Sequence, residues 1–246
     1  MNKLIRSEWI KLRTLRTTWI LSAVSILTAM LITGLATASI KEGTSAFERV
    51  DLLLTPAPLL VRLFILALGI MAFANEYRYG TIVPSLAAAP LRFELLGAKL
   101  VVLGGFGLIL GAVVTLASTA TGLTVLSIVG QPVSVLDGEI PRAIAGTVAF
   151  YGICAALGVG AGVLIRQPTI AIGVLIPWAL FAEKALGSFM PKVASYLPFT
   201  AGAQLYAVTT EGEPLDPGVG AALFLTWAAL VIVIGALLFQ RRDVAA

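Results

Sequence analysis

Histidine is absent from this chain of 246 residues, and cysteine occurs once, as Cys154. Without histidine the chain lacks the commonest general base, the Ser-His-Asp arrangement and the commonest ligand of transition metals. A single cysteine excludes a disulfide within the chain and a cysteine-based zinc site. Since Cys154 lies in an apolar segment, we interpret it as a small buried hydrophobe. We therefore predict no catalytic residues and no metal site.

Charge is also scarce. Charged residues make up 12% of the chain, hydrophobic residues make up 59%, and the mean hydropathy is +0.98. A soluble domain is usually about a quarter charged. Several apolar runs reach the roughly 20 residues that are needed to cross a hydrocarbon core of about 30 Å. The composition predicts a polytopic membrane protein.

Two further absences concern the source of energy. No phosphate-binding loop of the GxxxxGK[ST] type occurs in the sequence. No acidic residue lies inside an apolar run apart from Glu183, near the end of one of them. Pumps that are coupled to protons or sodium typically need such groups at mid-depth in the membrane. If ATP drives this protein, we expect another chain to bind it.

Six apolar windows predict an all-α membrane protein with six transmembrane helices, at about 18–40, 53–74, 97–127, 142–164, 169–187 and 218–239. The windows are continuous rather than alternating, which favours helices over a β-barrel. The first is longer than a signal-peptide core of roughly 7–15 residues, so we interpret it as a retained span. The third requires tilt or an end outside the bilayer. The fifth is short, and the proline-interrupted segment 188–217 after it is expected to be an outer re-entrant or interfacial element.

The distribution of lysine and arginine predicts the orientation. If the N-terminus is cytoplasmic, that side carries 11 of the 17 basic residues, the other side carries 5, and Arg62 lies within the second span. An excess of basic residues marks the cytoplasmic side. We therefore expect both termini in the cytoplasm, together with the loop at 75–96 and the short turn at 166–168. The loops at 41–52, 128–141 and 188–217 are expected outside.

Residues 1–17 predict an interfacial helix. Apolar side chains recur there at helical spacing, and basic side chains occupy much of the remaining surface. The predicted membrane-interface residues are Arg6, Trp9, Lys11, Arg13 and Arg16. The alternative is a plain positively charged anchor for the first span. The positive charge is modest and no nucleic-acid motif accompanies it, so we expect the lipid bilayer as a partner and no nucleic acid.

Arg62 is the one charge well inside a predicted span. An arginine in hydrocarbon is costly, and such residues mark polar cavities or partners, which makes Arg62 a candidate pathway residue. The alternative is that Pro56 and Pro58 delay the start of the helix, so that Arg62 reaches the outer headgroups.

Glycines recur at a four-residue spacing in two spans, as Gly107 with Gly111 and as Gly158 with Gly162. This spacing lets helix backbones approach closely. We expect close packing within one bundle.

The stretch NEYRYGTIVPSLAAAPLR, residues 75–92, places charged and turn-forming residues between two apolar spans. An N-terminal SEWIKLRTLRTTW, a second span ending in NEYRYGTI, a third opening after AAPLRFELLGAKL, and YLPFTAG at 196–202 accompany it. Together these segments resemble the permease subunits of ATP-binding-cassette transporters of the type-2 exporter class. The resemblance implies that 75–96 contains a cytoplasmic coupling helix between spans two and three. The ATPase-coupling residues would be Glu76, Tyr77, Arg78, Gly80, Thr81 and Arg166.

The resemblance also implies the partners. Separate ATPase subunits would bind ATP and magnesium, and this chain would bind no cofactor. A second permease copy, identical or different, would complete an export pathway in the plasma membrane, and the alanine- and glycine-rich composition suggests a bacterium. The mostly aliphatic spans are compatible with an apolar or amphiphilic cargo. The alternatives are a polytopic membrane enzyme acting on lipid, or a channel-like bundle without an ATPase.

Overall fold

The computed structural model describes residues 2–41, 43–88, 91–134, 140–208 and 215–241. Within these ranges the regular structure is entirely helical. The helices are α1 (Asn2–Thr14), α2 (Arg16–Ala38), α3 (Ala46–Leu54), α4 (Pro56–Arg78), α5 (Ile82–Ala88), α6 (Arg92–Ile128), α7 (Ile140–Ile165), α8 (Pro168–Pro177), the π-helical turn η1 (Trp178–Ala182), α9 (Glu183–Phe189), α10 (Pro191–Ala194), α11 (Pro198–Ala203) and α12 (Pro217–Arg241). Parts of the predicted loops, at 89–90, 135–139 and 209–214, lie outside the described residues.

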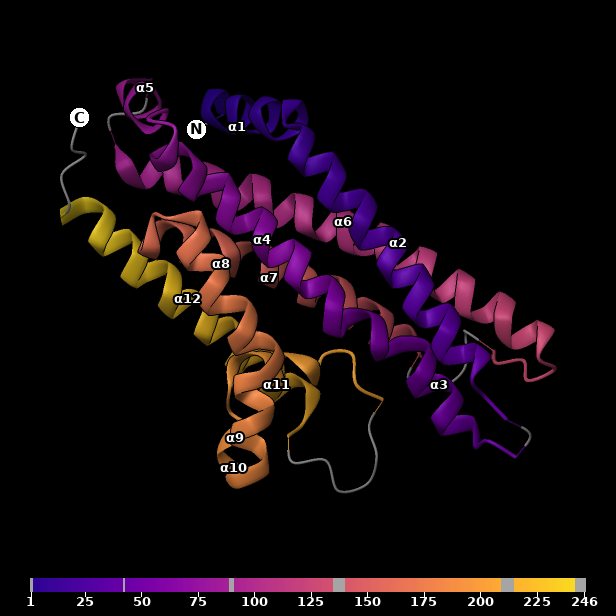
Figure 1. The fold of residues 1–246 in the computed structure, drawn as a ribbon. Coiled ribbons are helices and arrows are strands. Elements are labelled where there is room, and N and C mark those ends of the chain that lie inside the picture. Colours follow the sequence, from indigo (N-terminus) through magenta and orange to yellow (C-terminus); the bar gives the residue numbers. More distant parts are fainter. Residues whose placement is uncertain (1, 42, 89–90, 135–139, 209–214, 242–246) are drawn as a thin grey trace.

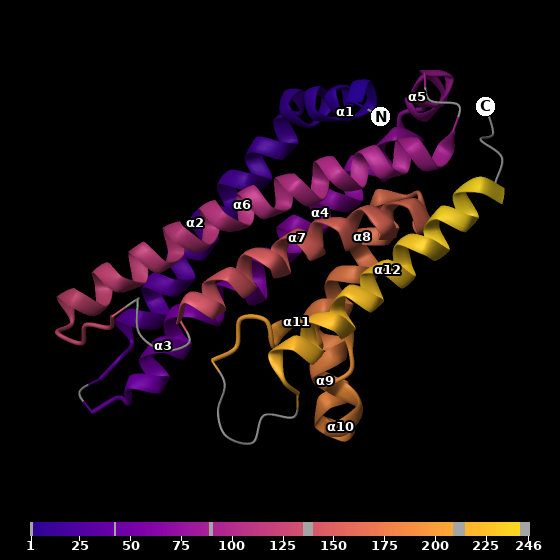
Figure 2. The same ribbon diagram turned by 180° about the vertical axis from the view of Figure 1, so that it is seen from behind.

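Six helical segments in the described ranges are long and apolar enough to cross a membrane, which confirms the prediction of six spans. They lie side by side in one elongated bundle (Figures 1 and 2). One end carries α1, α5, the start of α6 and the ends of α4 and α12, and we call it the α1 end. The other end carries α3, α9, α10 and α11, and we call it the α3 end.

Helix α2 buries its small and hydroxylated side chains and exposes its large apolar ones, which is the reverse of the pattern in a soluble protein. Its buried residues are small or hydroxylated: Thr18, Ser22, Ser25, Ala29, Thr33 and Thr37. Large apolar side chains such as Leu27, Leu31 and Leu35 are exposed instead. Some hydroxyl groups on the buried face donate to a carbonyl one turn earlier in the helix, as where Thr37 donates to Thr33 over 2.7 Å, whereas the Thr33 hydroxyl has no partner in the described structure. This pattern fits a bilayer, where lipid covers aliphatic side chains and small residues bring helices together.

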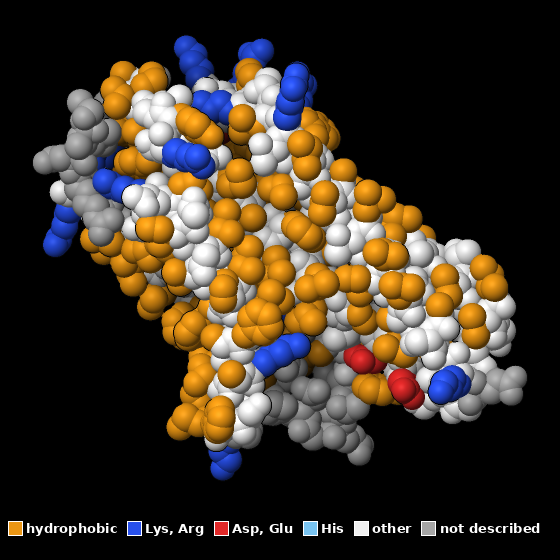
Figure 3. All heavy atoms as spheres, viewed as in Figure 1, with side chains coloured by type: hydrophobic (Ala, Val, Ile, Leu, Met, Phe, Trp, Pro, Cys, Tyr) orange, Lys and Arg blue, Asp and Glu red, His pale blue; other side chains and the backbone are white. Residues whose placement is uncertain are grey.

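The distribution of charged side chains on the surface also fits a bundle that spans a bilayer. In the view of Figure 3, lysine and arginine side chains gather at the α1 end, and the few carboxylates that are visible lie near the α3 end. Between the two ends this face shows apolar side chains and backbone, without charge. A band of this kind is what a hydrocarbon core requires of the surface that faces it.

Helix α7 lies at the centre of the bundle and packs against α4, α6 and α12. Glycines allow the closest of these contacts. A side-chain carbon added at Gly158 would lie 2.5 Å from the carbonyl oxygen of Leu66, and one at Gly162 would lie 2.7 Å from that of Ile70. On α6, Gly107 and Gly111 meet Ala155 and Tyr151 of α7 in the same way. The predicted close packing within one bundle is confirmed.

Helix α3 was not predicted, because the segment 41–52 reads as a loop. Ser45 accepts a hydrogen bond from the backbone N–H of Glu48 over 3.2 Å and so caps the first turn. Ser45 and Glu48 have the spacing of a capping box, which is the signal that the sequence interpretation missed. Leu53 and Leu54 at the end of α3 are buried, so the segment that was expected to be an outer loop leads into a packed helix.

Two other predicted spans differ in length from their helices. The third is the continuous helix α6, whose 37 residues correspond to about 55 Å. The fifth extends over 22 residues from Pro168 to Phe189. It changes from α-helix to the π-helical turn η1 directly after Pro177, a residue that has no N–H to donate.

Replacement of Gly158 by alanine tests the contact between α4 and α7. We expect Gly158→Ala to lower the free energy of unfolding by about 1–3 kcal/mol, because the added carbon meets backbone that cannot rotate away. The control is Gly104→Ala on α6, where an added carbon meets nothing within 4 Å. The measurement is unfolding of the purified protein in detergent, followed by tryptophan fluorescence. Equal effects of the two substitutions would contradict the prediction.

Candidate functional site

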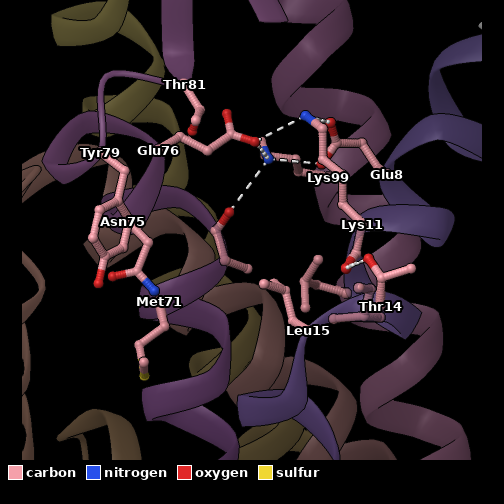
Figure 4. A pocket seen from close by; sticks show the side chains of 13 residues that line it. Glu8, Lys11, Thr14, Leu15, Met71, Asn75, Glu76, Tyr79, Thr81 and Lys99 are labelled. Atoms are coloured by element: carbon pink, nitrogen blue, oxygen red, sulfur yellow. Dashed lines mark hydrogen bonds and ion pairs between the residues drawn. The ribbon is translucent and has the colours of Figure 1, made fainter.

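Four charged side chains meet inside the α1 end of the bundle. Glu8 and Lys11 come from α1, Glu76 from the last turn of α4, and Lys99 from near the start of α6 (Figure 4). We call these four residues the ion cluster. It joins three helices that are far apart in the sequence.

The ion cluster is a closed set of short contacts. Lys99 Nζ lies 2.7 Å from Glu8 Oε2 and 2.7 Å from Glu76 Oε1. Lys11 Nζ lies 2.7 Å from Glu8 Oε1 and 2.9 Å from Glu76 Oε1. Lys99 also donates to the carbonyl of Ala72 over 3.3 Å. Each carboxylate therefore binds both ammonium groups.

Burial makes Lys99 the critical member. Its side chain is 1% exposed, whereas that of Lys11 is 39% exposed. A buried charge without a partner is strongly destabilising, so both acids are needed to hold Lys99 in the protein interior. Burial by itself lowers the pKa of Lys11, but hydrogen bonds and charge from Glu8 and Glu76 outweigh it and raise that pKa above 10.5.

The ion cluster also reaches the connection between α4 and α6. Lys11 Nζ donates to Ser85 Oγ on α5 over 3.1 Å. Beside these contacts is a cavity of about 420 Å³, lined by the ion cluster and by apolar side chains such as Leu15 and Met71 (Figure 4). Glu76 Oε2 is buried and has no hydrogen-bond partner in the described structure. A direct side-chain contact thus joins α5 to α1.

The predicted coupling residues divide into a buried and an exposed group. Glu76 is buried in the ion cluster, whereas Arg78, Gly80 and Thr81 are exposed where the chain leaves α4. Gly80 has a φ of 70°, a conformation that residues with a side chain adopt at a cost. This turn reverses the chain into the short helix α5. Residues 89–90 of the predicted loop lie outside the described ranges.

Tyr77 and Arg166 come together although they are far apart in the sequence. The Arg166 guanidinium lies over the Tyr77 ring, 4.5 Å from its centroid. Arg166 has a φ of 60°, which is uncommon for a residue other than glycine and points to a conformation held by its surroundings. A cavity of about 520 Å³ is lined by Tyr77, Arg78 and the turn that begins at Arg166. The structure therefore joins the two turns that were predicted to be cytoplasmic.

The predicted membrane-interface residues lie on or next to α1. Arg6, Arg13 and Arg16 are exposed. Trp9 is 40% exposed and packs on Phe106 of α6, with 6.4 Å between ring centroids. Lys11 differs from the expectation, because its ammonium turns inward to Glu8 and Glu76. Sequence reasoning also missed Glu8, which shares its buried face with Leu12 one turn later.

Arg62 lies toward the opposite, α3 end and is 4% exposed. Its Nη2 donates to the carbonyl of Ala179 in η1, and its guanidinium lies 5.1 Å from the centroid of the Phe199 ring. Arg62 is therefore directed toward η1 and α11.

Comparison with known proteins agrees with this architecture. A family model described as ABC-2 family transporter protein matches residues 4–181. The match spans α1, the ion cluster, the first four spans and most of the fifth. A membrane-spanning bundle of this kind is the membrane component of a transporter, and the chain belongs to the ABC-2 transporter family. No curated protein matches the chain.

Replacement of Lys99 by methionine tests the energetic weight of the ion cluster. We expect Lys99→Met to lower the free energy of unfolding by about 3–5 kcal/mol, because it leaves two buried carboxylates with a single, partly exposed cation. Lys11→Met is the matched control and should cost about 1 kcal/mol or less, because solvent screens its charge. Both are measured by unfolding in detergent. Equal losses would show that burial of Lys99 is not what matters.

Proposed function

We propose that this chain is the permease subunit of an ATP-driven exporter and that its α1 end faces the cytoplasm. Membership of the ABC-2 family supports the transport role. The excess of lysine and arginine at the α1 end supports the orientation. In this arrangement α1 lies along the inner leaflet, with the exposed Arg6, Arg13 and Arg16 near anionic headgroups.

The ATPase contact is proposed at the exposed part of the 75–96 segment together with Arg166. One observation carries this proposal: the cavity of about 520 Å³ that is shared by Tyr77, Arg78 and the 166–168 turn. Two turns that we place in the cytoplasm, and that are distant in the sequence, together line this cavity. Helix α5 directly follows the first of these turns in the chain. Arg78, Gly80 and Thr81 are exposed and available to a partner, and charged side chains suit a polar, transient interface.

Glu76 has a different role in this proposal. It is bound to Lys11 and Lys99 inside the chain, so it links the ATPase-contacting turn to α1 and α6. Motion that is imposed on α5 reaches α1 through Ser85 and Lys11. The ion cluster thus transmits motion, while the exposed residues bind the ATPase.

The mechanism needs no chemistry from this chain. ATP and magnesium are bound by the partner ATPase subunits, and their closure moves the coupling segment. A second permease copy, identical or different, completes the pathway. The permease contributes a difference in cargo affinity between two conformations, and ATP hydrolysis drives the exchange between them.

Co-purification tests the ATPase contact. We expect the wild-type protein, solubilised from its native membrane, to recover a P-loop ATPase identified by mass spectrometry. Arg78→Glu should reduce that recovery by at least about tenfold, because charge reversal at an interface adds repulsion to the loss of a hydrogen bond. Arg78 is exposed, so the fold should survive. The matched control is Arg241→Glu, an exposed arginine at the same end of the bundle.

The outcomes separate the alternatives. Recovery that is unchanged in Arg78→Glu would keep the transporter and move the contact away from this turn. If no ATPase accompanies the wild-type protein, the coupling proposal fails and a channel-like bundle or a membrane enzyme becomes the better interpretation.

Cysteine labelling tests the orientation. In a Cys154→Ala background, Thr81→Cys should react with a membrane-impermeant maleimide only after the cells are permeabilised. Ser188→Cys should react in intact cells, because it lies at the α3 end. Both side chains are exposed, so a difference in labelling reports the side of the membrane. Reaction of Thr81→Cys in intact cells would invert the topology.

A further inference from the structure

A third cavity lies at the α3 end, remote from the ion cluster. Its volume is about 410 Å³, and it opens between α3, the start of α4, η1, α9 and α11. Arg62 lines it together with apolar side chains, among them Pro56, Leu59, Phe199 and Ala203. A cationic group therefore faces a space with mostly aliphatic and aromatic walls.

Arg62 is a buried cation that no described carboxylate pairs with. Among the described residues it forms no ion pair, and its one hydrogen bond goes to the Ala179 carbonyl. Its Nε is buried and has no acceptor. A guanidinium carries five N–H donors, and a buried charge is retained when something compensates it. The Phe199 ring supplies only the weak attraction of a cation to an aromatic face.

The carboxylates that line the same cavity are engaged elsewhere. Glu183 accepts four hydrogen bonds: from Trp178 Nε1 at 3.1 Å, from the backbone N–H groups of Phe199 at 3.1 Å and Thr200 at 2.7 Å, and from Thr200 Oγ1 at 2.9 Å. Asp51 accepts the Thr55 hydroxyl over 2.6 Å. Neither acid forms an ion pair with Arg62 in the described structure, because its hydrogen bonds hold it to other groups.

We propose that this cavity binds an amphiphile with an anionic headgroup, a phosphate or a carboxylate. Its oxygens would accept from the Arg62 guanidinium and place a negative charge beside it, and an alkyl chain would lie against Leu59, Phe199 and Ala203. A planar guanidinium suits two-point binding of such oxyanions. Lys184 at the exposed side of the cavity adds a second positive charge.

The site has a consequence for transport that rests on the proposed function. If the chain is an exporter permease, an anionic amphiphile held at the outer end of the bundle is cargo at a late stage of its passage. Binding itself depends only on this chain and needs no ATPase. Failure of the binding test and failure of the co-purification test are therefore distinguishable.

The experiment is native mass spectrometry of the purified permease, released from a neutral detergent after incubation with dodecyl phosphate. We expect one bound molecule per wild-type chain. Arg62→Gln should weaken binding roughly 10- to 100-fold, as loss of a charge-assisted hydrogen bond predicts. Lys192→Gln makes the same charge change on an exposed side chain at the same end, outside the cavity, and should bind like the wild type.

Two further variants keep the test informative if Arg62→Gln does not fold. Arg62→Lys retains the charge but loses the two-point geometry, so it should bind more tightly than Arg62→Gln and more weakly than the wild type. Ala203→Leu fills the cavity, leaves Arg62 in place and should abolish binding. Folding of each variant is checked by circular dichroism.

Other probes decide the nature of the ligand. Dodecyltrimethylammonium, with the same chain and the opposite charge, should not bind, and inorganic phosphate alone should bind far more weakly. Equal binding of either probe would overturn the proposal. So would binding that survives Ala203→Leu, or that falls equally in Arg62→Gln and Lys192→Gln.

Discussion

The ion pairs of one buried lysine, Lys99, fix how α1, α4 and α6 pack at the α1 end of the bundle. Lys99 stands near the start of a helix otherwise built for hydrocarbon, and its side chain is almost wholly removed from solvent. Its charge is held in place by one carboxylate from α1 and one from α4, each at 2.7 Å. Separating these partners would leave an unpaired charge in an apolar environment. The three helices must therefore keep their relative positions or move together.

The same constraint divides the connecting segment after α4. Glu76, at its start, belongs to the interior, while Arg78, Gly80 and Thr81 are exposed. A segment that is anchored in the interior on one side and exposed on the other suits the proposed contact with an ATPase subunit. The contact from Lys11 to Ser85 extends the interior network onto α5 itself, so α1 and the segment after α4 are joined by one chain of polar contacts.

Away from this end the bundle depends on close backbone contact. Glycines of α7 lie against the backbone of α4, and α7 in turn supports α6 and α12. In lipid, burial of apolar side chains contributes little free energy to helix association. Close packing of helix backbones stabilises the bundle instead. The α3 end then shows two ways of treating a buried charge: Glu183 is satisfied by four donors, while Arg62 faces a cavity with one. That asymmetry distinguishes a structural acid from a cation that is available to a ligand.

Much of this architecture can be predicted from short sequence patterns. Continuous apolar windows determined six helices, because crossing a bilayer requires length and hydrophobicity that no other element has. The glycine spacing determined where helices approach, and the resemblance of residues 75–92 to exporter permeases pointed to the family that the comparison identified. Helix α3 could have been predicted from the Ser45 and Glu48 pair, which is also a local signal.

The partners of the charged residues were decided only by the tertiary structure. Glu8 and Lys11 read as part of a surface helix, Glu76 as part of a loop and Lys99 as the basic end of a span, and no short-range pattern relates them. They meet because α1 folds back over the ends of α4 and α6. Likewise only the packing of α11 shows that Glu183 accepts from its backbone N–H groups and that Arg62 forms no ion pair among the described residues. Hydropathy and spacing act over a few turns of one helix, whereas ion pairing depends on distances in space between segments that the chain brings together only when it is packed.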